Sequence, residues 1–148
     1  MEEYPIQLID IGVKELKIST EPPPQYGEDI DVNLFTLGVG HTDFDEENQR
    51  INIGLRFEYD QENAEKAESS NLTELAVEII GHFAIDTDNF PQDKIEHWAH
   101  NNAPYILIPY LREHIYSLTQ KSGFKPLIIP LFKVPTLNID NSTNNNQT

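Results

Sequence analysis

Two stretches of the chain alternate apolar and polar residues with the two-residue period of a half-buried β-strand. From Ile51 to Asp60, apolar residues stand at the odd positions and polar residues or glycine at the even ones. From Leu72 to Ile85 the alternation returns, with glutamates and a histidine among the polar positions. Ile6–Ile18 and Val32–Phe44 alternate less regularly but are rich in β-forming residues. The pattern predicts four strands in a sheet with one solvated, acidic face.

The segments between these strands indicate how the strands connect. Glu21–Asp29 contains three consecutive prolines, whose nitrogens carry no hydrogen and cannot join a ladder. This segment therefore predicts an extended loop, here called the crossing loop, between the first two strands. Asp45–Gln49 and Gln61–Asn71 are short and polar enough for hairpin-type connections. The later strands are expected to be antiparallel neighbours.

After Asp86 the apolar period lengthens to that of a helix. Gln92–Asn102 predicts a short helix and Ala103–Ser122 a longer one, which Gly123 is placed to end with a positive φ. Strands and helices together predict one α+β domain over residues 1–137. Residues 138–148 are rich in Asn, Ser and Thr and predict a disordered tail.

The longer predicted helix is apolar on more than one side. One stripe follows Leu107 along the helix, and a second contains Ile108. Because one small sheet can cover only one side of a helix, the other stripe predicts burial between subunits. The residues predicted at this interface are Leu107, Ile108, Leu111, Ile115, Tyr116 and Leu118.

Composition and charge narrow the classes of function. The 148 residues carry a formal net charge of -15, and residues 1–96 hold 23 of the 25 acidic residues. We expect no binding to nucleic acid, because such binding depends on Lys and Arg contacts to phosphates. The lack of cysteine excludes disulfides and thiolate metal sites. With no apolar run of membrane-spanning length and no signal-peptide pattern, we expect a cytoplasmic protein without membrane insertion.

Residue patterns typical of catalysis are sparse. The sequence holds no Gly-x-Ser-x-Gly elbow, phosphate-binding glycine loop or His-Glu-x-x-His motif, and we expect neither an enzyme nor a cofactor. His97 and His100 stand three residues apart on a predicted helix beside Glu96, a set that can ligate a metal ion. Such pairs next to an aromatic residue more often stack, cap or hydrogen-bond locally, so we expect no metal there.

The C-terminal third carries a specific resemblance. Ala103–Glu113, followed by Gly123–Leu127 and Pro130, resembles the signature of the SecB family of bacterial protein-export chaperones. In that family a Pro-x-x-Leu-Phe-Pro-Tyr-x-Arg-Glu helix ends at a Gly-x-Phe-Pro turn. His97 stands where the family has an Ala-His motif, and the first predicted strand looks like the family's first strand. The resemblance covers most of residues 5–132.

The resemblance implies a four-stranded antiparallel sheet with helices on one face, assembled as a dimer of dimers. It also implies an ATP-independent holdase that binds unfolded preproteins in a groove and delivers them to the SecA motor of the Sec translocase. The aromatic residues expected in that groove are Tyr26, Trp98, Tyr105, Tyr110, Phe124 and Phe132. The glutamates expected to dock SecA are Glu21, Glu58, Glu74 and Glu78.

Three differences from the family pattern keep other functions open. The crossing loop is shorter, with Tyr26 as its single aromatic residue, and Lys17 stands where the family has an acidic residue. The family's second long helix has no counterpart after Phe132. One alternative is a SecB-like chaperone dedicated to one client, such as the antitoxin of a toxin–antitoxin pair. Another is a structural subunit of a larger complex.

Overall fold

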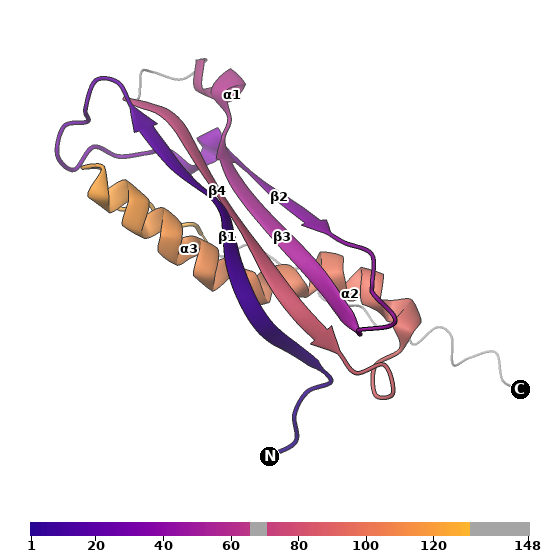
Figure 1. Cartoon of the computed structure of the whole chain (residues 1–148). Helices are drawn as coiled ribbons and strands as arrows, with labels where there is room; N and C mark the ends of the chain where they lie inside the picture. The colour runs from indigo at the N-terminus through magenta and orange to yellow at the C-terminus, as the bar shows by residue number, and fades with distance from the viewer. Residues whose placement is uncertain (66–70, 131–148) are drawn as a thin grey trace, which may run out of the picture.

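Four antiparallel strands form a single sheet in the computed structural model, which describes residues 1–65 and 71–130 (Figure 1). The strands are β1 (Ile6–Thr20), β2 (Phe35–His41), β3 (Arg50–Tyr59) and β4 (Leu72–Ile85). Their order across the sheet is β1-β4-β3-β2, so β1 and β2 lie at opposite edges. The predicted antiparallel sheet is confirmed, and the crossing loop connects its two edges.

The second strand is shorter than its predicted range, Val32–Phe44. Before it, the side chain of Asp31 caps a 3-10 turn, η1 (Val32–Leu34). After it, the backbone N–H of Asn52 donates to the hydroxyl of Thr42 at 3.0 Å instead of to a backbone carbonyl. Hydrogen bonds between side chains and nearby backbone compete with strand pairing, so the ladder is confined to the centre of the predicted range.

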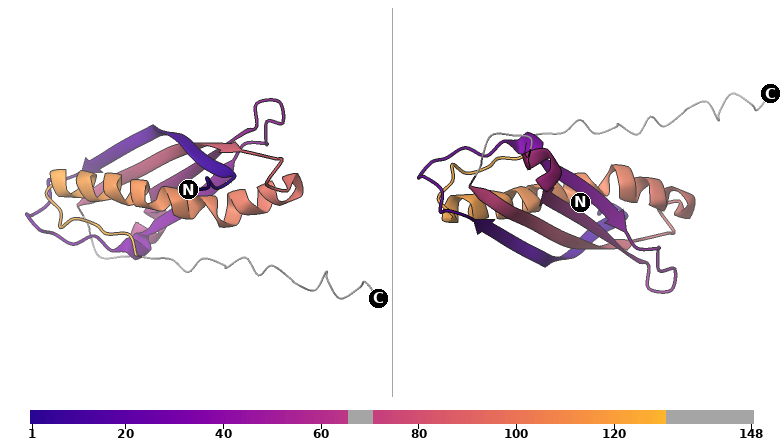
Figure 2. Two further views of the ribbon diagram at one scale, coloured as in Figure 1. Left: turned by 90° about the horizontal axis from the view of Figure 1, so that it is seen from below. Right: turned by 90° about the horizontal axis from the view of Figure 1, so that it is seen from above.

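Two helices follow the sheet, as the sequence predicts. They are α2 (Ile95–Asn101), preceded by a 3-10 turn, η2 (Gln92–Lys94), and α3 (Ala103–Lys121); a short helix, α1 (Gln61–Glu65), lies between β3 and β4. Gly123 has the positive φ, 93°, that is expected of the residue ending α3. Figure 2 shows α3 lying along one face of the sheet, where it contacts β1, β3 and β4.

The core fills the space between α3 and this sheet face. The side chains that the alternation assigned to one face of β3 and β4 are buried there, with Ile53, Leu55 and Ile79 fully so. Helix and sheet approach closely at Gly81 of β4, because a Cβ added to this glycine would lie 2.6 Å from Leu107 Cδ2. The absence of a side chain at Gly81 therefore sets how near α3 can lie to the sheet.

The segment after α3, residues 122–130, turns back along the helix and is here called the returning segment. The backbone N–H of Leu127 donates to Thr119 Oγ1 at 2.9 Å, and Thr119 is fully buried. The crossing loop joins the same region, since the backbone N–H of Gly27 donates to the carbonyl oxygen of Gly123 at 3.0 Å. Loop and returning segment thus fix the C-terminal end of α3. The predicted tail, residues 138–148, lies outside the described residues.

Candidate functional site

The buried side of α3 holds most of the residues predicted at a subunit interface. Leu107, Leu111 and Ile115 have no exposed surface, Ile108 is 9% exposed and Leu118 packs against the same cluster. These five side chains belong to the core of their own chain, because sheet and returning segment together bury two sides of the helix. An apolar stripe in the sequence does not show whether the sheet, the returning segment or another subunit covers it. Tyr116, which is 41% exposed, is the interface candidate that remains open to a partner.

The aromatic residues predicted for a client groove are divided between core and surface. Trp98 is buried and packs edge-on against Phe83, with ring centroids 5.1 Å apart. Phe124 is buried and Tyr105 is partly buried against the core. Tyr26 and Tyr110 are exposed, whereas Phe132 lies outside the described residues. The structure therefore does not bring the five described residues together in one groove, and buried Trp98 and Phe124 are unavailable to a client in this conformation.

Exposed apolar side chains gather on the outer side of α3. Ile106, Tyr110 and Tyr116 are each at least 41% exposed, and Ile106 and Tyr110 stand one helical turn apart. We call these three residues the outer α3 face. Sequence reasoning placed Tyr110 and Tyr116 in separate sites and missed Ile106, because that position falls outside both apolar stripes.

A second exposed apolar patch lies on edge strand β1. Val13 and Leu16 are about half exposed, and they stand opposite Ile79 and Val77 of β4, which are buried beneath α3. By the alternation of a strand, their side chains point to the α3 side of the sheet. They stay exposed because, among the described strands, β1 lies at an edge of the sheet. Exposed apolar groups of this kind are frequent at sites of protein association.

The sheet face opposite α3, here called the open face, holds the predicted SecA-docking glutamates of β3 and β4. Each of these has a cationic partner, and the pairs and their N···O distances are Lys17–Glu74 at 2.8 Å, Lys14–Glu78 at 3.1 Å and Arg56–Glu58 at 3.0 Å. Arg56 also lies 2.7 Å from Glu15. Glu21 is exposed at the end of β1. The acidity that the sequence predicts for this face is therefore largely neutralised on the sheet itself.

The electrostatics of the open face follow from these pairs. Hydrogen bonding to Lys17 lowers the pKa of Glu74, and hydrogen bonding to Arg56 lowers the pKa of Glu58. Hydrogen bonds to Glu58 and Glu15 raise the pKa of Arg56. Both carboxylates and their cations are thus charged at neutral pH and engaged with each other.

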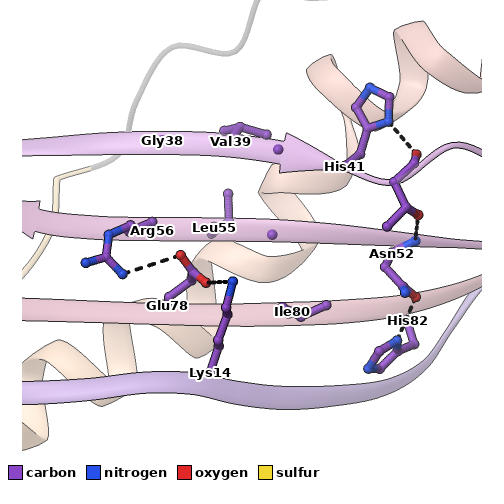
Figure 3. Close-up of a pocket in the computed structure, with 13 residues that line it drawn as sticks. Lys14, Gly38, Val39, His41, Asn52, Leu55, Arg56, Glu78, Ile80 and His82 are labelled. Carbon is purple, nitrogen blue, oxygen red and sulfur yellow. Dashed lines mark hydrogen bonds and ion pairs between the residues drawn. The ribbon is translucent and has the colours of Figure 1, made fainter.

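A shallow hollow of about 440 Å³ lies on the open face beside these pairs (Figure 3). In its floor Ile80, Gly54 and Gly40 stand opposite one another on β4, β3 and β2. Its rim is polar, with Lys14, Arg56, Glu78 and His82 among the lining residues. Ile80 is the apolar side chain in a row otherwise of glycine, so the backbone of the sheet is accessible here.

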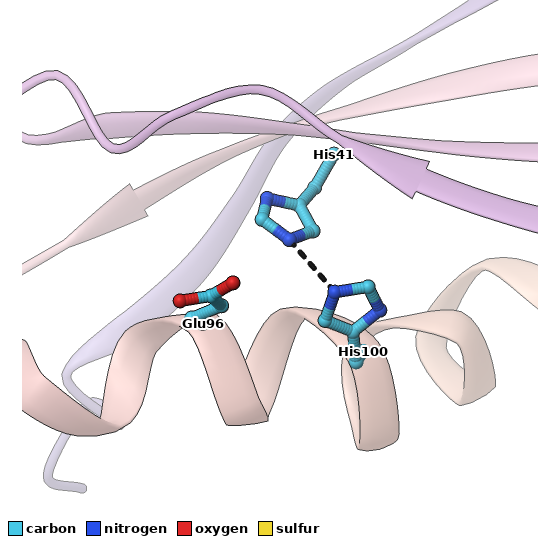
Figure 4. A group of neighbouring side chains, drawn as sticks. All are labelled: His41, Glu96 and His100. Carbon is cyan, nitrogen blue, oxygen red and sulfur yellow. Dashed lines mark hydrogen bonds between the residues drawn. The ribbon is translucent and has the colours of Figure 1, made fainter.

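His97 and His100, the pair at which the sequence predicts local hydrogen bonding and no metal, have different partners. The His97 ring nitrogen Nδ1 lies 3.1 Å from Asn101 Nδ2 on its own helix, in line with the expected local hydrogen bonding. His100 instead meets His41, from the end of β2, with 3.0 Å between their Nε2 atoms (Figure 4). Glu96 completes this group. No local pattern indicated His41, because 59 residues separate it from His100.

The architecture is that of an α+β protein in which one long helix covers a four-stranded antiparallel sheet of order β1-β4-β3-β2. Residues 7–137 match the family model described as SecB, preprotein translocase subunit SecB, and the chain belongs to the SecB family. Within the described residues, no helix is both long and apolar enough to cross a membrane.

Two individual proteins show the range of similarity. The chain is 29% identical over 100 residues to the protein-export protein SecB of Afipia carboxidovorans, a match that spans 68% of this chain and 54% of that protein. The chain thus spans about half the length of this curated relative. The Mycobacterium tuberculosis SecB-like chaperone Rv1957, solved with a ChAD peptide from the HigA1 antitoxin, superposes with a TM-score of 0.58 at 16% identity. That match covers 86% of this chain and 90% of the other, and it shows a shared fold.

Proposed function

We propose that this protein is an ATP-independent holdase chaperone, located in the cytoplasm, which binds unfolded precursor proteins and delivers them to SecA. Membership of the SecB family supports this role. The observation that carries it is the exposed apolar pair Ile106 and Tyr110, which stand one helical turn apart on the outer α3 face. Apolar contact with an unfolded chain is non-directional and needs no bound nucleotide. No catalytic step is involved.

Client binding is assigned to the exposed aromatic residues of the predicted groove. Tyr26 on the crossing loop and Tyr110 on α3 are accessible, and Tyr105 lies partly buried on the same helix. Tyrosine offers a large apolar surface with few rotatable bonds, so it contacts varied sequences at a low entropic cost. Ile106, one turn from Tyr110, extends this surface.

Assembly as a homotetramer, a dimer of dimers, is part of the same proposal. Val13 and Leu16 on the free edge of β1, with Tyr116 on α3, are the exposed apolar residues that a second copy would cover. Light scattering at physiological salt should give four chains per particle. Tyr116→Glu should lower that number, because assembly would bury its charge. A monomeric parent protein would contradict the proposed assembly.

A dedicated-client chaperone is the second candidate. It is favoured by the pairing of Glu58, Glu74 and Glu78 with cations on the open face, which leaves fewer free carboxylates for SecA. The structurally similar Rv1957 was solved with an antitoxin peptide. Such a protein would bind one client in preference to all others, and co-purification with one dominant small protein would identify it.

Aggregation of chemically denatured proteins tests the holdase function. Stoichiometric amounts of the parent protein should suppress light scattering by several unrelated clients, with or without ATP. The double variant Ile106→Ser/Tyr110→Ser should suppress it much less, while Glu113→Gln on the same exposed side of α3 serves as the matched control. Suppression of one client alone would favour the dedicated chaperone. Suppression of none would contradict both chaperone functions.

A further inference from the structure

Three potential metal ligands converge where the end of β2 meets α2. His41 is the last residue of β2, and Glu96 and His100 lie one turn apart on α2. The two Nε2 atoms are 3.0 Å apart, and all three ligand atoms lie within 4.8 Å of one another. Figure 4 shows both rings and the carboxylate on facing sides of the strand end and the helix.

A backbone contact fixes the tautomer of His41. Its Nδ1 lies 2.7 Å from the carbonyl oxygen of Thr42, which can only accept a hydrogen bond, so Nδ1 carries the proton. The lone pair then belongs to Nε2, which faces His100. Metal-binding histidines commonly have the second ring nitrogen held by such a carbonyl. The orientation of His41 and the proton on its Nδ1 therefore match those of a histidine that binds a metal ion through Nε2.

In the metal-free protein the two rings share one hydrogen bond. With both imidazoles neutral, His41 Nε2 accepts, so His100 Nε2 carries the proton and donates. Metal binding through Nε2 would require the His100 proton to move to Nδ1, an exchange through solvent that the exposure of this side chain permits. To bind a metal ion, the present arrangement thus needs a change of tautomer at His100 and no change of fold.

The distance between the two histidine Nε2 atoms is close to the distance between two nitrogens that bind the same transition-metal ion. Zinc–nitrogen bonds of about 2.0–2.1 Å at tetrahedral angles place two ligating nitrogens roughly 3.3–3.4 Å apart. The nitrogens here need to separate by only a few tenths of an ångström. A hollow of about 210 Å³ that is lined by His41, Glu96 and Asp43 adjoins the group and gives an ion and a further ligand access.

We propose that His41, Glu96 and His100 form a Zn²⁺ site with an open fourth position for water or for a ligand from another molecule. Two imidazoles and one carboxylate form a ligand set that suits zinc. The ion would join the end of β2 to α2, two elements that are otherwise in limited contact (Figure 1). The site is independent of the proposed chaperone function, since none of its residues belongs to the apolar surfaces.

Calorimetric titration of the chelator-treated full chain with ZnCl₂ tests the site. We expect one ion per chain with a Kd of about 10 μM or tighter. His41→Ala and His100→Ala should each weaken binding about tenfold or more, a change of about 1.4 kcal/mol per tenfold, and Glu96→Gln should weaken it less. The matched control is His97→Ala, which removes a neighbouring histidine of the same helix and should change Kd by less than about twofold.

Two further readouts distinguish a built site from adventitious binding. Co²⁺ bound in place of zinc should give the visible absorption of a four- or five-coordinate ion in the parent and in His97→Ala, but not in His41→Ala. The far-UV circular dichroism of each variant in EDTA should equal that of the parent, so that lost binding is not lost folding. Absence of zinc binding by the parent would overturn the proposal. Equal weakening by His97→Ala and His41→Ala would also overturn it, since it indicates unspecific binding by surface histidines.

Discussion

The ammonium nitrogen of Lys17 lies 2.8 Å from a carboxylate oxygen of Glu74, so that strand β1 neutralises the acid of its neighbour β4. Lys17 stands where the SecB pattern has an acidic residue. The open face therefore lacks the negative charge of that residue, and the negative charge of Glu74 is neutralised by Lys17. Docking of a partner on this face would require either that these pairs break or that Glu21 provides the attraction. Under the proposed function, the strength of SecA binding would therefore depend on this pair.

Affinity for SecA should depend on the glutamates of the open face. Exposed charge pairs contribute about 0.2–1 kcal/mol each, so the variant Glu21→Gln/Glu74→Gln/Glu78→Gln should bind SecA roughly threefold to a hundredfold more weakly at low salt. The difference should shrink at physiological salt because the charges are screened. Calorimetry in both buffers measures it, and equal affinities in both would exclude this face as the docking surface.

The reverse change, Lys17→Glu, should tighten SecA binding. It removes a cation from the open face, adds an acid and releases Glu74 from its partner. Lys125→Glu is the control with the same change of charge at an exposed position outside the sheet. If the two variants bind equally, net charge alone is responsible. A parent protein with no affinity for SecA would direct attention to the dedicated-client function.

The Lys17–Glu74 pair should also be visible in the titration of Glu74. Hydrogen bonding to Lys17 holds the pKa of Glu74 below the ordinary value of 4.5. The pair therefore stabilises the fold at pH values above 4.5, and this stabilisation is lost as the pH falls through the lowered pKa. In Lys17→Gln the pKa of Glu74 should return towards 4.5. Carboxyl ¹³C NMR measures this shift. Glu58, whose pKa is lowered by Arg56, should keep its value and serves as the internal control.

Gly81→Ala should destabilise the fold, because the added methyl group meets Leu107 at 2.6 Å. Overpacking of a core typically costs about 1–3 kcal/mol, and urea unfolding should show a loss of this size. Gly12→Ala is the matched control, since no atom lies within 4 Å of its added Cβ and this glycine is also in the sheet. Equal losses in the two variants would show that alanine is unfavourable in these strands for some reason other than contact with α3.

The elements of this fold were largely predictable from local pattern, whereas the surfaces were not. β3 and β4 follow from their alternation because one face of each lies beneath α3, and the end of α3 follows from Gly123. The burial of Trp98 depends on its contact with Phe83, which no helical period reveals. A pattern identifies an apolar position but not the neighbour that covers it.

The charge pairs and the histidine group depend on topology in the same way. Arg56 and Glu15 are 41 residues apart in sequence and meet because a single strand, β4, lies between β1 and β3. The order of strands also brings His41 to α2. The sequence identifies the acidic residues and the histidines, but their partners follow from the strand order. The sequence-predicted acidic face is consequently a face of paired charges.

The contact between an unfolded client and the outer α3 face can be measured directly by photo-crosslinking. A photoreactive amino acid replaces Tyr110 on this face or, as a control, Thr36, which is exposed on β2 and stands opposite Glu58. Each protein is mixed with a denatured precursor and irradiated. The proposed function predicts a client adduct from position 110 and little or none from position 36. Efficient crosslinking from position 36, with none from position 110, would contradict the assignment of client binding to α3.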